Sequence, residues 1–299
     1  NTAVGYEALR DVEPASKVDM YNVGLGFKAG TNASAGTDFT GLKNTLLGSF
    51  AGAEITSGDS NVAVGYQAGG GASGSAVTGD NNTSAGDNAL GAVTTGHSNT
   101  AIGKNAMLNS TEATYATALG FAALQNTTAG SGNVAVGGFS MQNNTSGDRN
   151  VAVGYLTLDA NQQGDRNTAV GYEALTTLNP SGNVDTYNSA FGYRSLASLT
   201  TGTANTALGF GTLENTTTGA NNTAVGGAAL QVNDGDRNTA VGYNSLQANS
   251  SGDYNTAVGW GSLVSNTSGN YNVGIGYEAL DSTDDGANNV GVGYGALGA

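Results

Sequence analysis

The chain has 299 residues, of which 49 are Gly and none is Cys, and its 9 Lys and Arg face 23 Asp and Glu for a net charge of −14. So few cations argue against a nucleic-acid or anionic-membrane partner, because clustered Lys and Arg are what bind both. The absence of Cys excludes disulfides and thiolate metal sites, and no apolar run reaches the ~20 residues of a transmembrane helix.

One short segment recurs along the whole chain, reading NTAVGYEAL at 1–9 and 167–175 and NTAVGYNSL at 238–246. Its first residue is Asn in every copy but one, which has Ala116. The 17 copies begin at residues 1, 22, 44, 61, 82, 99, 116, 133, 150, 167, 188, 205, 222, 238, 255, 272 and 289, and eleven of the 16 intervals are 17 residues long. A fixed period of this kind indicates a repeat architecture, so we treat 1–299 as a single repeat domain.

Each copy is expected to begin with a short strand. With the Asn as position 0, position 1 is Thr, Val or Ser and position 3 is apolar in 16 of 17 copies, with smaller residues mostly between them. This alternation has the two-residue period of a strand. We expect positions 1 and 3, including Val241, to lie in the core. The residues that share a position in successive copies are called a column below.

A bend and a second short strand are expected next. Position 4 is Gly in all 17 copies, which indicates a positive φ or a neighbour too close for a Cβ. Position 5 is aromatic in 12 copies, and position 8 is Leu or Met in 14, which predicts a second packing column. Copies with Gly30, Gly52 or Gly69 at position 8 are expected to pack less tightly, or against a different neighbour.

The end of each copy is predicted to be a surface turn. A Gly precedes the next Asn by three residues in 13 of 16 cases, and G-x-x-N is a typical turn sequence. The longer intervals add their residues here, as at 176–187 and within 10–60 and 70–81. Tolerance of insertion indicates a loop at the surface.

These elements predict an all-β parallel β-solenoid, or β-roll, of about 17 coils. One copy is too small to fold alone, but stacked copies pair each strand with its equivalent ~4.8 Å away. The result would be a rod about 80 Å long. An apolar column left outside would exceed the few hundred Å² that monomers usually expose, so we expect it to meet other copies of the chain.

The copies, for example NTAVGYNSLQANSSGDY at 238–254, resemble the head repeats of YadA-type trimeric autotransporter adhesins. Those repeats read S-V-A-I-G-x-x-(A/S), with about 14 residues each; here Asn and Thr replace Ser and Val, and the turn is longer. Related repeats occur in bacteriophage tail fibres. The resemblance covers essentially the whole chain and implies a left-handed homotrimeric rod on a bacterial surface or a virion. It does not separate adhesin from phage fibre.

We therefore expect a non-enzymatic extracellular fibre, a shaft or head that attaches to a host-surface glycan or protein. The chain opens on the first residue of a copy, so we expect it to be a fragment of a longer fibre. We expect no membrane insertion within these 299 residues. His97, the one His, lies in a predicted turn and has no catalytic partners in the sequence. The alternative is a module that binds glycan or ice through a repeated face, and ten Thr in column 1 motivate the ice hypothesis.

Calcium is the one candidate metal that the sequence indicates. Asp148 and Asp165 each stand two residues before the next Asn, and stacked turns would bring them about 5 Å apart. Arg149 and Arg166 follow directly, however, so neutralisation by Arg is the simpler interpretation. We expect no cofactor and keep these two carboxylates as weak Ca²⁺ candidates.

The aromatic column at position 5 is the main candidate for an interaction site. Tyr and Trp rings at regular spacing can stack on sugars, or they can pack between chains. Between these two readings we favour packing, and Trp260 is the best glycan candidate if a ring is exposed. The candidate residues are Tyr155, Tyr172, Tyr193, Phe210, Tyr243, Trp260, Tyr277 and Tyr294.

Overall fold

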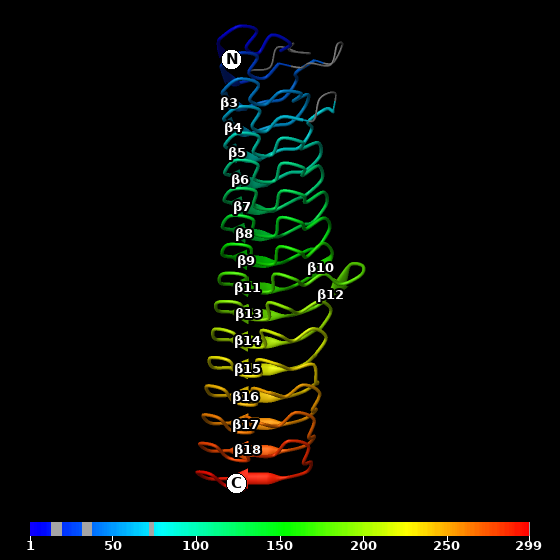
Figure 1. The fold of residues 1–299 in the computed structure, drawn as a ribbon. Coiled ribbons are helices and arrows are strands. Elements are labelled where there is room, and N and C mark those ends of the chain that lie inside the picture. Colours follow the sequence, from blue (N-terminus) through cyan, green and yellow to red (C-terminus); the bar gives the residue numbers. More distant parts are fainter. Residues whose placement is uncertain (13–19, 32–37, 72–74, 299) are drawn as a thin grey trace. The chain divides into compact units, whose positions relative to one another are not determined.

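The structure is a computed structural model that describes residues 1–12, 20–31, 38–71 and 75–298. This part of the chain contains no helix and forms a parallel β-solenoid, as predicted (Figure 1). The chain divides into two compact units, unit 1 (Asn1–Arg149) and unit 2 (Asn150–Ala299), and each is described by itself.

Unit 1 carries one three-residue strand in each coil. Every strand pairs in parallel with the equivalent strand of the next coil, position for position, as in Thr100↔Thr117. The pairing confirms that like residues stack on like. The strands are β1 (Thr2–Val4), β2 (Val23–Leu25), β3 (Thr45–Leu47), β4 (Val62–Val64), β5 (Thr83–Ala85), β6 (Thr100–Ile102), β7 (Thr117–Leu119) and β8 (Val134–Val136).

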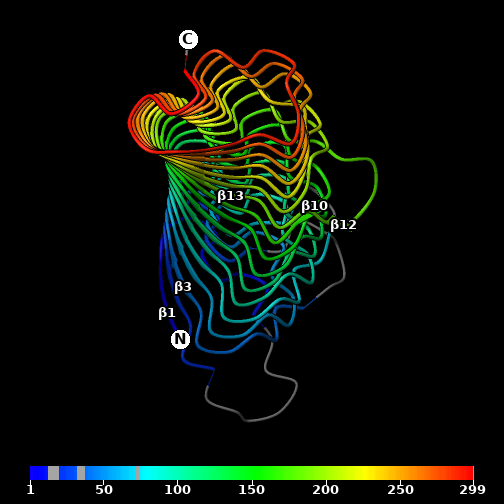
Figure 2. The same cartoon turned by 90° about the horizontal axis from the view of Figure 1, so that it is seen from below.

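Unit 2 repeats the same coil with the same register, as in Thr239↔Thr256. Its main strands are β9 (Val151–Val153), β11 (Thr168–Val170), β13 (Ser189–Phe191), β14 (Thr206–Leu208), β15 (Thr223–Val225), β16 (Thr239–Val241), β17 (Thr256–Val258), β18 (Val273–Ile275) and β19 (Val290–Val292). The two-residue strands β10 (Gly164–Asp165) and β12 (Val184–Asp185) pair in parallel apart from the main sheet, at the long turn 176–187 that projects from the coils (Figure 2).

The side chains of the strands face the opposite way from the prediction: position 2 faces inward, and positions 1 and 3 face outward. In β16, Ala240 is fully buried, whereas Thr239 is half-buried and Val241 is 37% exposed. The expectation that positions 1 and 3, with Val241, lie in the core is therefore wrong. The period of two was right, but its phase was not, because the interior beneath each strand is filled by Ala at position 2 and Leu at position 8.

Column 8, predicted as a second packing column, forms the bulk of the core. Leu246 and most of its Leu and Met equivalents are fully buried, although each adopts the left-handed conformation, with φ of 51° at Leu246; Leu297 is the exception, at 64% exposed. The predicted second strand does not form in the described residues, since positions 5–10 make consecutive turns. These turns bring column 8 back under the strand.

In coils with Gly at position 8, a different residue occupies the space of the missing Leu. This was one of the two outcomes expected for these copies. Leu46 stands at position 2 in place of the usual Ala and is fully buried. A Cβ on Gly30 or Gly52 would come 2.7 or 2.4 Å from a methyl carbon of Leu46. In the copy that begins at residue 44, the core volume is thus moved from position 8 to position 2 rather than lost.

The Gly of position 4 is required for two reasons, both anticipated from the sequence. Gly242 has a φ of 132°, a region that other residues rarely enter. A Cβ there would lie 2.5 Å from the carbonyl oxygen of Gly259, the equivalent residue of the next coil. The stacking distance therefore leaves no room for a side chain.

The Asn of position 0 is a buried structural residue, which the sequence analysis did not foresee. The side-chain oxygen of Asn238 accepts the backbone N–H of Asn255 at 2.9 Å, and its Nδ2 donates to the carbonyl of Gly252 at 2.8 Å. Each Asn thus ties its coil to the next and closes its own turn. The pattern recurs at Asn188, Asn205, Asn222 and Asn255 in unit 2, and at Asn22, Asn44, Asn61 and Asn82 in unit 1.

Longer intervals add loops at the predicted place. The turn 176–187 is described in full, and there the side chain of Gln163 accepts the N–H of Gly182 at 2.9 Å. The longer turns predicted within 10–60 and 70–81 fall partly on 13–19, 32–37 and 72–74, which lie outside the described residues.

Candidate functional site

Columns 1, 3 and 5 form the outer surface that we call the strand face. In unit 2, Leu208 is 50% exposed and Ile275 40%, and the other members of column 3 are exposed or half-buried. Thr or Val lines one side of column 3, and the aromatic rings line the other. Within unit 2 the strand face therefore continues from coil to coil as an apolar surface.

The aromatic column of unit 2 is a stack of rings rather than a row of separate ones. Tyr155, Tyr172 and Tyr193 stack with centroids 5.8 and 5.4 Å apart and planes within 16°. Trp260 stacks between Tyr243 at 6.5 Å and Tyr277 at 5.0 Å. Tyr294 continues the stack at 5.1 Å from Tyr277. The structure thus brings the predicted residues of this column together along one edge of the strand face.

Stacking decides what these rings can offer to a ligand. Trp260 is 44% exposed, but its two ring faces are covered by Tyr243 and Tyr277, so its edge is what solvent reaches. A sugar that stacks on an aromatic ring needs a free face. The geometry therefore favours packing over sugar stacking at Trp260.

One gap in this column is filled by its neighbour. Gly227 stands at position 5 between Phe210 and Tyr243, and a Cβ there would lie 2.5 Å from the Phe210 ring. Phe210 leans across Gly227, so that its centroid is 6.3 Å from that of Tyr243, two coils away. The apolar surface is thereby kept continuous.

Two Tyr hydroxyls in the stack stay protonated over a wide pH range. Hydrogen bonding to Glu173, together with its charge, raises the pKa of Tyr172 above its ordinary value. Partial burial and the charge of Glu278 raise the pKa of Tyr277 in the same direction. Both phenols therefore remain hydrogen-bond donors at neutral pH.

Arg and Tyr stand just before the Asn of several coils and form a short polar column. Arg166 makes a salt bridge with Asp185 and lies 5.6 Å from the ring centroid of Tyr187. Arg237 lies 5.2 Å from the ring centroid of Tyr254, which stacks on Tyr271 at 5.0 Å. Sequence analysis missed this column; the Tyr and Arg directly before Asn150, Asn167, Asn188, Asn238, Asn255 and Asn272 were the signal.

The weak calcium candidates have structural contacts. Asp148, in unit 1, accepts the backbone N–H of Ser131 at 2.7 Å, and Asp80 and Asp59 do the same for the coils before them. Asp165, in unit 2, lies in β10, and its backbone carbonyl accepts the N–H of Thr186. Among the described residues no three His, Cys, Asp or Glu gather as metal ligands would. Arg166 makes a salt bridge with Asp185.

Unit 1 has a less regular strand face. Ser49, Asp87, Lys104 and Gly138 interrupt column 5. Phe50 and Phe139, one position later, fill two of these gaps with edge-on contacts to Tyr66 and Phe121. Lys104 and Asp87 form an exposed ion pair at 3.3 Å. His97 lies edge-on to Tyr115, with ring centroids 5.2 Å apart.

The fold and its columns define the class: a repeat protein of the parallel β-solenoid kind. No protein-family model matches the sequence, and no curated protein matches it. Within the residues that the structure describes, no helix is long and apolar enough to cross a membrane.

Proposed function

We propose that the chain is a segment of a non-enzymatic extracellular fibre, a shaft or head that associates with copies of itself through the strand face. The observation that carries the proposal is the exposure of columns 3 and 5 in unit 2, for example at Leu208, Phe210 and Trp260. Monomers rarely leave a contiguous apolar surface of more than a few hundred Å² in water.

A second copy of the chain is the partner that matches this surface best. The same residue types recur in every coil at one fixed spacing, so a parallel copy meets the same pattern at every step. Assembly about a threefold axis would enclose the strand faces of three chains and make the fibre stiff. The resemblance of 238–254 to trimeric adhesin head repeats supports the homotrimer and its left-handed coil.

Attachment to a host-surface glycan or protein follows from the repeated array. Several weak contacts along three chains raise the overall affinity without one strong site. The net charge of −14 fits a surface that repels nucleic acid and anionic lipid. We place the fibre on a bacterial cell surface or on a virion.

The test introduces charges on the strand face of alternate coils. Leu208→Glu, Val241→Glu and Ile275→Glu combined should convert an oligomer into a monomer in sedimentation equilibrium, with an unchanged far-UV circular dichroism spectrum. All three side chains point outward, so the coil itself can keep its fold. The matched control, Asn215→Glu, Val232→Glu and Ser282→Glu, places the same charges on exposed positions away from the strand face. A monomeric wild-type chain would contradict the self-association.

Ice binding is the second candidate, and one observation favours it. Thr206, Thr223, Thr239 and Thr256 stand in consecutive coils of column 1, exposed or half-buried, on the strands of unit 2. A regular row of Thr can order water. Thermal hysteresis that disappears in Thr223→Tyr with Thr239→Tyr would support this function, and a wild-type chain without hysteresis would remove it.

A further inference from the structure

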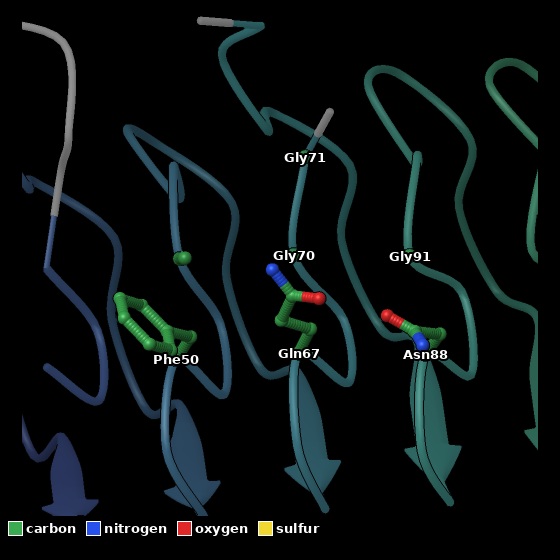
Figure 3. Close-up of a pocket in the computed structure, with 7 residues that line it drawn as sticks. Phe50, Gln67, Gly70, Gly71, Asn88 and Gly91 are labelled. Carbon is green, nitrogen blue, oxygen red and sulfur yellow. The ribbon is translucent and has the colours of Figure 1, made fainter. Parts of the chain in front are cut away.

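A recess opens in unit 1 next to the aromatic edge of the strand face, where column 6 follows column 5 (Figure 3). Its volume is about 130 Å³, and Phe50, Ala53, Gln67, Gly70, Gly71, Asn88 and Gly91 line it. Pockets for drug-sized ligands hold roughly 300–1,000 Å³. This recess therefore has room for one small ring.

The recess exists because three successive coils have only Ala or Gly, and therefore no long side chain, at position 9. Ala53, Gly70 and Gly91 occupy this position, whereas Gln125 and Gln142 occupy it in later coils of the same unit. In those coils Gln142 donates to Gln125 at 2.7 Å and covers the surface. Omission of the side chain uncovers the backbone and the neighbouring column 6.

Column 6 presents an aromatic ring and two amides to the recess. Figure 3 shows Phe50, Gln67 and Asn88 side by side, with the Gln67 amide beside Gly70. The Phe50 ring is turned 73° from the plane of Phe27 and 86° from that of Tyr66, so neither ring lies flat on its faces. The Asn88 amide donates to Asp87 at 2.7 Å, while no protein partner holds the Gln67 amide among the described residues.

The lining selects the chemistry of the ligand. None of the seven lining residues is charged, so an ionic ligand would lose its hydration without a counterion. A wholly apolar ligand would bury the Gln67 amide without a hydrogen bond, which costs about 1–3 kcal/mol. A neutral ring with hydroxyls on its rim and an apolar C–H face suits both the amides and the Phe50 ring.

We propose that this recess binds a single neutral pyranose ring. The Gln67 amide offers one donor group and one acceptor to the sugar hydroxyls, the Asn88 carbonyl oxygen offers another acceptor, and Phe50 contacts the C–H face. The site goes beyond the self-association proposed above, and the two residues changed in its test, Gly70 and Gln67, lie outside columns 1, 3 and 5. Loss of sugar binding therefore leaves the oligomeric state unchanged.

In the experiment, the full chain is titrated separately with methyl β-glucopyranoside, methyl β-galactopyranoside and N-acetylglucosamine. Binding of each sugar is measured by saturation-transfer NMR. The blocking variant is Gly70→Gln, which restores the residue that other coils carry at this position. Gly70 has an ordinary backbone conformation, and a Cβ there meets nothing closer than 3.5 Å, so the fold accommodates the side chain. Gln67→Ala removes the amide and provides a second variant, should Gly70→Gln not fold.

At least one sugar is expected to bind, and each variant is expected to weaken its binding about tenfold or more. The control Asn105→Ala removes an amide from the same column outside the recess and should leave binding unchanged. Absence of binding by all three sugars overturns the proposal. So does equal binding by Gly70→Gln, or equal loss in the control.

Discussion

Units 1 and 2 are built from the same type of coil but differ in the irregularities that they contain. Unit 1 has Gly at position 8 in three copies, a fully buried Leu46 at position 2, and an interrupted aromatic column. Unit 2 keeps Leu in column 8 and rings in nearly all of column 5. In both, the Gly of position 4 remains, and the hydrogen bonds of the Asn column recur in all copies but the one with Ala116. Core volume can be redistributed within a coil, whereas the backbone contacts between coils cannot.

The largest effect is expected from a Cβ at position 4 in either unit. Gly242→Ala in unit 2 and Gly65→Ala in unit 1 both force a methyl group to within 2.6 Å of a carbonyl oxygen. Each should destabilise its unit by about 3 kcal/mol or more, which urea unfolding followed by circular dichroism would measure. A cost near zero in unit 1 would show that its irregular coils relax, and would break the comparison. Gly70→Ala, at an unstrained Gly, is the control.

The redistribution of core volume in unit 1 can be reversed. Leu46→Ala alone should leave a cavity and cost about 3 kcal/mol. Adding Gly52→Leu restores the Ala and Leu of the regular coil and should recover most of that loss, because column 8 accepts Leu at positive φ elsewhere. The same urea titrations on the single and double variants give the coupling energy. Additive costs would contradict the compensation.

Truncation of a single Asn of column 0 should cost more free energy of unfolding than the small size of its side chain suggests. Asn205→Ala in unit 2 leaves the N–H of Asn222 and the carbonyl of Gly219 without their partner, at a cost of about 2 kcal/mol. Unit 1 holds the natural counterpart at Ala116. There, Ala116→Asn should stabilise the unit by about 1 kcal/mol, measured as a higher unfolding midpoint. A destabilised Ala116→Asn would mean that this coil has closed around the smaller residue.

The smallest expected change in stability concerns position 9. In unit 1, Gln142 donates a hydrogen bond to Gln125 at this position, whereas in unit 2 the buried Oδ1 of Asp159 has no hydrogen-bond partner among the described residues. Burial raises the pKa of Asp159 above its ordinary value. The folded state therefore holds the proton more tightly than the unfolded state, and stability declines as pH rises through this range. Asp159→Gln should remove that decline, with a gain of about 0.5 kcal/mol at neutral pH. Parallel pH profiles for both proteins would contradict it.

Residue patterns predicted the period, the parallel stacking, the Gly of position 4 and the buried column 8. They failed on Val241, because β-branched side chains occupy an outward strand position as readily as a buried one. They also missed Asn238, whose buried amide is satisfied by groups 14 and 17 residues away. Such partners become visible once the coils are closed and stacked.

The sequence by itself determined the repeat and its spacing, since a 17-residue period with an invariant Gly leaves stacked coils as the arrangement that can bury the apolar residues. The tertiary structure decided which side of each strand faces inward. The space between strand and returning turn is so narrow that Ala and Leu fill it, and this sends Val241 and Trp260 outward. It also decided the recess at Gly70, because an omitted side chain makes a cavity or a flat surface according to what its neighbours in adjacent coils cover.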